Sequence, residues 1–284
     1  MDAAKMTPPF FTIITSTYNA AATLPHLLDS LASQTCRDFN WIVQDGASSD
    51  ATMQIMEQYR SRLPEILADS SKDSGIYDAW NKAIDRWQDN MGEWVLFLGA
   101  DDMLTDKDTL HRVKNKIKQI SNKVLFCAGD IIIVNHNNIK SKTVLTTAHD
   151  SFKRKNYRIP FPHSSLFTKK SCLLTHKFDT SFKIRGDYDF ILKILKNEDQ
   201  IYLLHTFVTY MSIGGISSQE TMRRIYTFES LKIFFRIKSI RGLIWCFDNY
   251  IYQRKIKLKN IFQQSNLGEK IWFTLQYVRK KFFP

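Results

Sequence analysis

Short apolar runs alternate with amphipathic stretches along the first hundred residues. Phe10 to Thr17 is apolar and β-branched, which favours a buried strand. Leucines then recur at i, i+3, i+4 and i+7 from Leu24 to Leu31, so they share one helical face. Two more strand and helix pairs follow, with strands at 40–44 and 66–68 and helices after Asp50 and from Ile76. This order predicts one half of a doubly wound α/β sheet.

The segment WVLFLGADD, residues 94–102, ends this series. Five consecutive apolar residues predict a strand that is covered on both faces. Ligands of open α/β sheets bind at the carboxyl ends of the strands, where Asp101 and Asp102 would lie. Adjacent carboxylates repel each other unless a cation joins them to a phosphorylated ligand. The alternative is an ordinary Asp-rich turn. Asp45 and Asp73 also follow predicted strands, and this series of acidic strand ends favours a ligand site.

The helix predicted from Ile76 has two unlike faces. Its apolar stripe consists of Ile76, Trp80, Ala83, Ile84 and Trp87. The opposite side carries Tyr77, Asp78, Asn81 and Lys82. Asp78 and Lys82 are spaced for a surface ion pair, and contact of Lys82 with a phosphate is the other interpretation.

The second half has weaker signals. We expect a helix across 110–120, one or two strands in 124–134 with a hairpin into 139–145, and separate strands at 201–204 and 207–211. A helix opens near Asp187 and runs through residue 196. Helical spacing places Asp187 on the face of Phe190, toward the core, and Asp189 in an exposed pair with Lys193. Asp187 could instead simply cap the helix.

Charge separates the chain into two parts. Residues 1–218 hold 26 Lys and Arg against 24 Asp and Glu, whereas residues 219–284 hold 14 against 4. The basic last quarter indicates an anionic partner, and its final amphipathic helix could lie in a membrane interface or pack on the domain. We identify no signal peptide and no apolar run long enough to span a membrane. The four cysteines are scattered, which favours a reducing compartment.

Four motifs in sequence order, TIITSTYN, VQDGASSD, DSGIYDAWNKAI and FLGADD, cover residues 10–102. With the looser FPHSSLF and GDYDF, they resemble the inverting GT-A-type glycosyltransferases of family 2, which build bacterial surface polysaccharides. The resemblance implies an α/β fold that is Rossmann-like, with a mixed, mostly parallel central sheet flanked by helices and a C-terminal helical extension. The implied domains are a GT-A domain at 1–218 and a basic, mostly helical region at 219–284. Within the first, 10–102 would bind the nucleotide sugar and 103–218 would hold the acceptor and catalytic half.

The resemblance also assigns roles to residues. Asp187 would be the catalytic base, Asp102 the ligand of Mg²⁺ or Mn²⁺, and His163 part of the acceptor pocket. The nucleotide-sugar-binding residues would be Thr17, Tyr18, Asp45, Asp73, Lys82 and Asp101. Two positions depart from the family pattern. Gly99 stands where Asp is frequent, which removes one possible metal ligand, and Gly186 stands where Glu is common.

We therefore expect a metal-dependent enzyme that moves a sugar from a nucleotide-diphosphate sugar to a saccharide hydroxyl with inversion. The acceptor would be lipid-linked, and the protein would be cytoplasmic and peripheral on the inner face of the cell membrane, without a nucleic-acid partner. One alternative is a basic nucleic-acid-binding protein. The other is a carboxylate-based hydrolase or phosphoryl-transfer enzyme on a similar sheet. No GxGxxG follows the first strand, which argues against a dinucleotide dehydrogenase.

Overall fold

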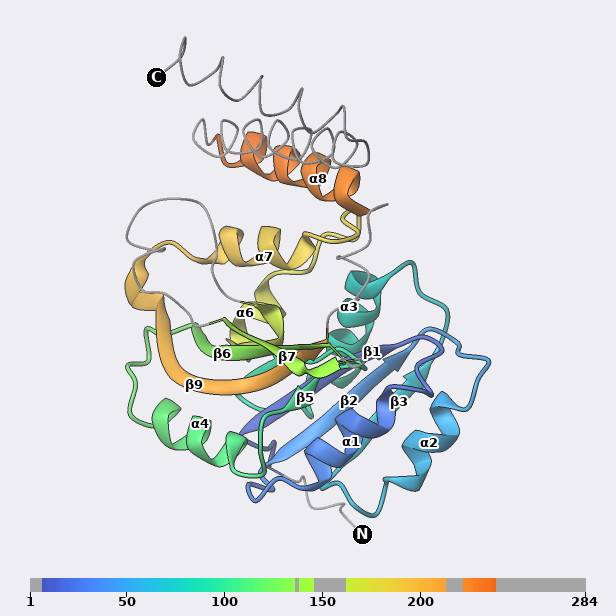
Figure 1. The fold of residues 1–284 in the computed structure, drawn as a ribbon. Coiled ribbons are helices and arrows are strands. Elements are labelled where there is room, and N and C mark those ends of the chain that lie inside the picture. The colour runs from blue at the N-terminus through green and yellow to red at the C-terminus, as the bar shows by residue number, and fades with distance from the viewer. Residues whose placement is uncertain (1–6, 136–137, 146–161, 213–221, 239–284) are drawn as a thin grey trace, which may run out of the picture. The chain divides into compact units, whose positions relative to one another are not determined.

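The computed structural model describes residues 7–135, 138–145, 162–212 and 222–238. The chain divides into two compact units, Met1–Tyr226 and Thr227–Pro284, each of which is described by itself. The first unit is a mixed α/β structure built on a nine-stranded sheet (Figure 1). The predicted α/β class is therefore confirmed.

The first half of the sheet is parallel, as its alternating pattern predicts. Its strands stand in the order β3-β2-β1-β4, with bounds β1 Phe11–Thr17, β2 Phe39–Asp45, β3 Ile66–Ser70 and β4 Trp94–Phe97. The connecting helices are α1 Leu24–Ala32, α2 Thr52–Gln58 and α3 Ile76–Trp87. Every residue of β4 is buried, in agreement with its uninterrupted apolar run. Because these strands are parallel, their carboxyl ends lie at one edge of the sheet.

The second half adds antiparallel strands. β8 (Leu166–Lys169) runs antiparallel to β4 and to β6 (Phe126–Asn135), and β6 pairs with β7 (Asn138–Leu145) as the expected hairpin. β9 (Ile201–Ser212) is one strand, where two had been predicted. His205 has a φ of 46°, and the register with β6 shifts nearby, so an irregularity bends the strand without ending it. The short β5 (Met103–Leu104) pairs with β9.

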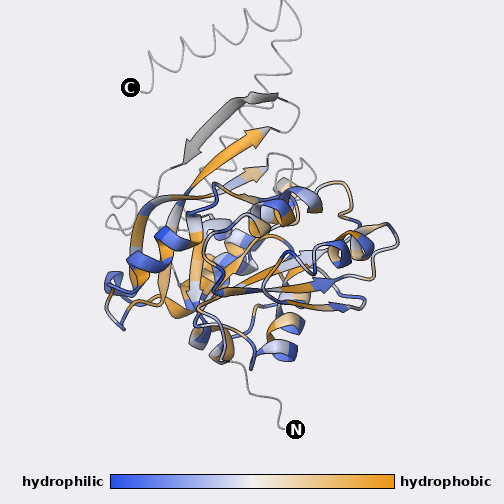
Figure 2. Ribbon diagram, turned by 90° about the horizontal axis from the view of Figure 1, so that it is seen from below, coloured by the Kyte–Doolittle hydropathy of each residue, from blue (hydrophilic) through white to orange (hydrophobic). Residues whose placement is uncertain are grey.

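Helices cover both faces of the sheet (Figure 1). α1, α2 and α4 (Thr109–Ile117) lie on one face, and α3, α6 (Lys170–Thr175) and α7 (Gly186–Ile194) lie on the other. The leucines of α1 are fully buried against strand residues such as Phe11 and Trp41. Figure 2 shows hydrophobic stretches in several strands, and helices on which hydrophobic and hydrophilic residues alternate. Burial of these faces is the dominant stabilising contribution.

The two faces of α3 differ from the predicted ones. Ile76, assigned to the apolar stripe, is 39% exposed, whereas Tyr77, assigned to the polar side, is 3% exposed. The reason is tertiary: the ring of Tyr77 packs on Phe178 and against the start of α7. α3 is thus covered on two sides, which a pattern for a helix lying on one surface does not anticipate.

The described part of the second unit is its beginning, from Thr227 to Lys238, within and just beyond α8 (Met222–Arg236). Phe228 and Phe235 are 70% and 66% exposed. Within the residues that the structure describes, no helix is both long and apolar enough to cross a membrane. The predicted boundary at 218/219 and the helices expected beyond residue 238 lie outside the described residues.

Candidate active site

Thr17, Asp45 and Ser70 end three neighbouring parallel strands and stand in register across the sheet. β4 ends one strand further along and leads into Gly99 and the two aspartates. The backbone N–H of Leu98 donates to the carbonyl oxygen of Ile14, so this loop stays beside β1. Thr17, Asp45 and the Asp101–Asp102 pair, which belong to separate motifs, therefore lie along one edge of the sheet.

Asp45 is completely buried and accepts four hydrogen bonds. Thr17 Oγ1 (2.7 Å) and Ser48 Oγ (2.5 Å) donate to Oδ1, and the Ser48 N–H (2.8 Å) and Ser70 Oγ (2.7 Å) donate to Oδ2. Burial raises the pKa of the Asp45 carboxyl, but the donors from Ser48, Ser70 and Thr17 outweigh it and keep the pKa below its ordinary value. A nucleobase contact would have to replace one of these hydroxyl donors.

Ser48 extends this network to the loop after β1. Its hydroxyl accepts the N–H of Asn19 at 2.8 Å while donating to Asp45. Asn19 in turn accepts the N–H of Ser49 at 2.9 Å. Asp50 precedes α2 and accepts the N–H of Thr52 at 3.0 Å, although the N-cap position is that of Ala51. Asp45 thus holds together the two loops that frame the predicted nucleoside site.

Tyr18 and Asp73 meet over Gly46. A Cβ at Gly46 would lie 2.8 Å from Asp73 Oδ2 and 3.4 Å from the Tyr18 ring. Tyr18 is 70% exposed, so one face of its ring is open to a ligand. Gly46 was not singled out from the sequence, although the DG step of VQDGASSD contained the signal.

Lys82 is attached to the loop that carries Asp73. Its ammonium donates to the carbonyl oxygen of Lys72 at 2.7 Å and pairs with Asp78 Oδ2 at 3.1 Å. The same Asp78 oxygen accepts the N–H of Ser74. The surface ion pair expected from the spacing therefore exists, and contact of Lys82 with a phosphate stays a prediction.

Asp102 is the buried member of the carboxylate pair. It is 6% exposed, and its Oδ2 accepts the N–H of Gly99 at 2.9 Å. Burial, reinforced by the negative charge of Asp101, raises the pKa of Asp102 to about 7 despite the N–H donors of Gly99 and Ser212. Two adjacent carboxylates of this kind suit a cation, which would relieve their repulsion.

The fit to a divalent metal depends on ligands from outside the chain. No group of three His, Cys, Asp or Glu that could hold a metal occurs within the described ranges. Mg²⁺ commonly uses one or two carboxylates and takes its remaining oxygens from phosphates and water, so the Asp101–Asp102 pair fits such a site. A Cβ at Gly99 would lie 2.8 Å from Asp101 Oδ1 and 3.2 Å from Asp102 Oδ2. Aspartate at position 99 would thus force both carboxylates to move.

Asp187 lies in the first turn of α7, where it contacts the first turn of α3. Its Oδ1 accepts the Tyr77 hydroxyl at 3.2 Å and the Tyr188 N–H at 2.8 Å. Asp189, which helical spacing had assigned to an exposed pair, is only 2% exposed, so that prediction is wrong. The ion pair with Lys193 does form, at 2.6 Å, but on the buried side of the helix. α7 is covered on more of its circumference than an amphipathic pattern implies.

His163 lies at the start of the 3₁₀ turn His163–Ser165, close to Asp187. Its ring stacks on Trp80 with centroids 4.8 Å apart, and Phe97 packs at 5.0 Å. Both ring nitrogens are buried and have no hydrogen-bond partner among the described residues. Burial lowers the pKa of His163, while the charge of Asp187 acts in the opposite direction. A neutral imidazole beside a carboxylate can hydrogen-bond a substrate hydroxyl.

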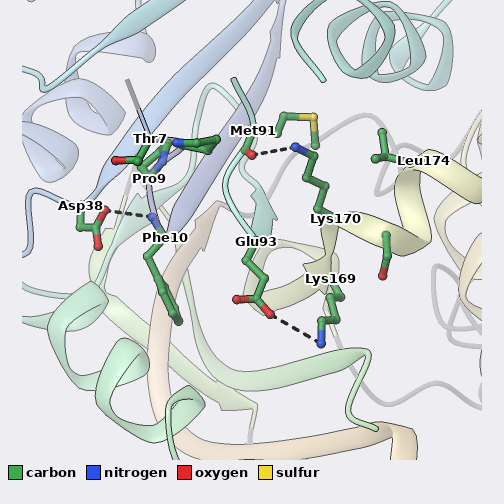
Figure 3. A pocket seen from close by; sticks show the side chains of 11 residues that line it. Thr7, Pro9, Phe10, Asp38, Met91, Glu93, Lys169, Lys170 and Leu174 are labelled. Carbon is green, nitrogen blue, oxygen red and sulfur yellow. Dashed lines mark hydrogen bonds and ion pairs between the residues drawn. The ribbon is translucent and has the colours of Figure 1, made fainter. Parts of the chain in front are cut away.

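A pocket of about 680 Å³ lies elsewhere (Figure 3). Its walls come from residues that precede β1 and β4, from the end of β8 and from α6, including Phe10, Glu93 and Lys169. β1 and β4 begin there, so this pocket is at the end of the sheet opposite to the aspartates. Its cations are already engaged, since Lys169 pairs with Glu93 at 3.5 Å and Lys170 donates to the Met91 carbonyl oxygen at 3.0 Å.

Comparison with known proteins supports the assignment made from the motifs. The family described as Glycosyl transferase family 2 matches residues 12–178. A PGL/p-HBAD biosynthesis glycosyltransferase of Mycobacterium bovis is 33% identical over 217 residues, which are 75% of this chain and 81% of the relative. The poly(ribitol-phosphate) β-N-acetylglucosaminyltransferase TarS of Staphylococcus aureus is 25% identical over 212 residues, 74% of this chain and 34% of that protein.

Solved structures show the same fold. The crystal structure of S. aureus TarS 1–349 in complex with UDP-GlcNAc matches with a TM-score of 0.60 and 23% identity, over 79% of this chain and 66% of that one. The mannosyltransferase PcManGT from Pyrobaculum calidifontis, in complex with GDP-Man and Mn²⁺, gives 0.59 and 18%, over 82% and 65%. The chain thus spans less than two thirds of either solved structure. With its sheet order, the aspartates at the strand ends and a family match across more than half of its length, the chain belongs to glycosyltransferase family 2 and has a GT-A-like fold.

Proposed function

We propose that the chain transfers a sugar from a nucleotide-diphosphate sugar to a hydroxyl group of a saccharide acceptor, with inversion. The observation that carries this proposal is the Asp101–Asp102 pair at the end of β4, on the same edge of the sheet as Thr17 and Asp45. Buried acid at that edge suits a diphosphate held through a cation. The TarS structure with UDP-GlcNAc and the PcManGT structure with GDP-Man and Mn²⁺ support this donor class.

The donor half has distinct tasks. The exposed ring of Tyr18 offers a face on which a nucleobase can stack, while Asp45 and Thr17 hold the loops around it. Asp73 and Lys82 line the same rim, and Asp101 accepts from the ribose hydroxyls. Asp102 is the metal ligand, and Mg²⁺ or Mn²⁺ bound there would stabilise the negative charge that develops on the leaving diphosphate.

The acceptor half supplies the base. Asp187 takes the proton from the acceptor hydroxyl as that oxygen attacks the anomeric carbon, while the diphosphate leaves from the opposite face. Attack from the face opposite to the leaving group inverts the anomeric configuration. We assign His163 to the wall of the acceptor pocket, because its ring lies close enough to Asp187 to feel the charge of that carboxylate.

A lipid-linked acceptor at the inner face of the cell membrane fits the C-terminal region. The exposed Phe228 and Phe235 of α8 are seven residues apart and share a helical face, and Arg224, Arg236 and Lys238 are exposed nearby along the helix. Residues 219–284 carry ten more basic than acidic side chains. Each Lys or Arg near an anionic leaflet contributes about 1 kcal/mol of attraction.

The proposal is tested by thermal stability with nucleotides and metal. UDP or GDP together with Mn²⁺ should raise the Tm of the wild-type protein by several degrees, because ligands that bind the folded state stabilise it. Asp102→Ala should lose most of this shift. Asp89→Ala, which removes an exposed carboxylate elsewhere, should keep it.

A nucleotide-sugar screen then identifies the donor, and NMR of the product gives its anomeric configuration. An unchanged Tm with every nucleotide and metal would contradict the proposal. Release of free sugar from a saccharide without any nucleotide would point to the hydrolase alternative instead.

A further inference from the structure

Tyr77 is a buried phenol for which the reaction described above has no role. It is 3% exposed in the first turn of α3, and its ring packs on Trp80 and Phe178 at centroid distances of 5.4 and 5.9 Å. Its hydroxyl reaches across to α7 and donates to Asp187 Oδ1 at 3.2 Å. A side chain that is fixed by packing along its length holds its terminal atom in place.

The phenol stays protonated at any working pH. Burial, together with the charge of Asp187, raises the pKa of Tyr77 far above its ordinary value. The hydroxyl is therefore a permanent donor toward the carboxylate. The Tyr188 N–H donates to the same oxygen at 2.8 Å. Both donors bind Oδ1, and no donor to Oδ2 occurs among the residues that the structure describes, so we assign Oδ2 to take the proton from the acceptor.

Gly186 explains how Tyr77 comes so close. A Cβ at Gly186 would lie 2.7 to 2.9 Å from three carbons of the Tyr77 ring, a separation that real Cβ atoms do not adopt. The ring occupies the space that a side chain at position 186 would fill. The absence of a side chain at 186 and the tyrosine at 77 are thus one structural feature, formed by α3 and α7 together.

We propose that Tyr77 is a positioning residue that fixes the carboxylate of Asp187 for proton abstraction, and that Gly186 is required because it admits the Tyr77 ring. This inference rests on the proposed function, since it presumes that Asp187 is the base. It adds a requirement that lies on α3, in the donor-binding half of the chain. The helix that follows the Asp73 loop would thereby orient the base of the acceptor half.

The first test is Tyr77→Phe, which removes the hydroxyl and keeps the ring. We expect kcat to fall about tenfold, with KM for donor and acceptor unchanged within about twofold. Tyr59→Phe is the matched control, because the Tyr59 hydroxyl donates to Asp29 at 2.9 Å on the remote surface. An unchanged kcat in Tyr77→Phe, or a loss shared by the control, would overturn the proposal.

The second test concerns Gly186. Gly186→Ala should lower kcat at least as much as Tyr77→Phe does, because the new methyl group displaces the ring. In a Tyr77→Ala background the same change should cost nothing further, since the ring is gone. An equal loss in both backgrounds would show that Gly186 acts independently of Tyr77.

A crystallographic comparison separates this inference from the proposed function. In Tyr77→Phe the Asp187 carboxylate should leave its wild-type rotamer or occupy more than one, whether or not the wild-type protein transfers a sugar. If Asp187 stays in its wild-type rotamer, the positioning role is wrong even for an active enzyme. The wild-type protein could also prove inactive with every donor while the Asp187 rotamer changes in Tyr77→Phe. The proposed function would then be wrong, and the positioning of Asp187 by Tyr77 would be confirmed.

Discussion

At the scale of single residues, the site depends on carboxylates whose surroundings differ sharply. Asp45 is buried but satisfied by four donors, and its pKa is lowered. Asp102 is buried beside another carboxylate, and its pKa is raised to about 7. The ionised Asp45 carboxylate is suited to hold loops in place. The ionised Asp102 carboxylate destabilises the folded protein unless a cation is bound. All are aspartates in turn-like sequences, so only the partners in the fold distinguish their chemistry.

The pH dependence of stability tests the state of Asp102. Its folded pKa of about 7 lies above the unfolded value of 3.8, so protons bind the folded state more tightly. The stability gained from that proton is fully present below about pH 4 and lost as the pH rises through about 7. Relative to Asp102→Asn, the free wild-type protein should lose on the order of 2 kcal/mol between about pH 5.5 and 8.

Denaturant titrations of both proteins at the two pH values measure this difference. Nucleoside diphosphate with Mn²⁺ should restore the stability of the wild-type protein at the higher pH but not that of the variant. Parallel stability curves for the two proteins would mean that Asp102 ionises normally.

At the scale of elements, α7 shows how tertiary packing changes the meaning of a sequence pattern. Its first turn holds two aspartates. Asp187 faces Tyr77 of α3 and Asp189 is buried with Lys193, whereas helical spacing had placed Asp189 in solvent. The spacing correctly identified the i, i+4 pair but not the elements that cover it. The same limitation explains the misassigned faces of α3.

The two aspartates should therefore respond differently to amidation. Asp187→Asn should keep its Tm within about 2 °C and lose about 10²- to 10⁴-fold in kcat, because the general base is removed. Asp189→Asn should weaken the ion pair between this buried side chain and the half-buried Lys193, and lower the free energy of unfolding by about 1–3 kcal/mol. Its kcat when folded should stay near that of the wild type.

Steady-state kinetics and thermal unfolding of the two variants distinguish these outcomes. Binding of the donor to Asp187→Asn is the control for an intact site. Comparable activity in both variants would remove Asp187 as the base.

At the scale of the whole molecule, the charge separation in the sequence leads to a prediction about membranes. The first 218 residues are nearly neutral, and the last 66 hold most of the +12 charge. The full chain should bind vesicles containing anionic lipid, release them as salt is raised, and show little affinity for DNA or RNA.

Two triple variants with the same loss of charge test where this binding originates. Arg279, Lys280 and Lys281 changed together to Gln should weaken vesicle binding about 150-fold, at about 1 kcal/mol per charge. Lys107, Lys118 and Lys123, which are exposed in the first unit, should tolerate the same change with little effect. Equal losses in both, measured by vesicle sedimentation, would assign the attraction to net charge alone. Tight, salt-sensitive retention on nucleic acid would favour the nucleic-acid-binding alternative.

The sequence by itself determined the fold class, the order of the first four strands and the family. These properties follow from local periodicity and from motifs whose residues are close together in the chain. It also placed Asp45, Asp73 and Asp102 at or after the ends of parallel strands, whose carboxyl ends lie at one edge of a sheet.

Tertiary structure alone decided what surrounds each carboxylate. The four donors of Asp45 come from the ends of the two neighbouring strands and from the loop that follows β2. The contact of Tyr77 with Asp187 spans 110 residues, and Gly186 matters only because the Tyr77 ring lies against it. Side-chain burial and hydrogen bonding depend on elements distant in sequence, so periodicity within one helix or strand carries no information about them.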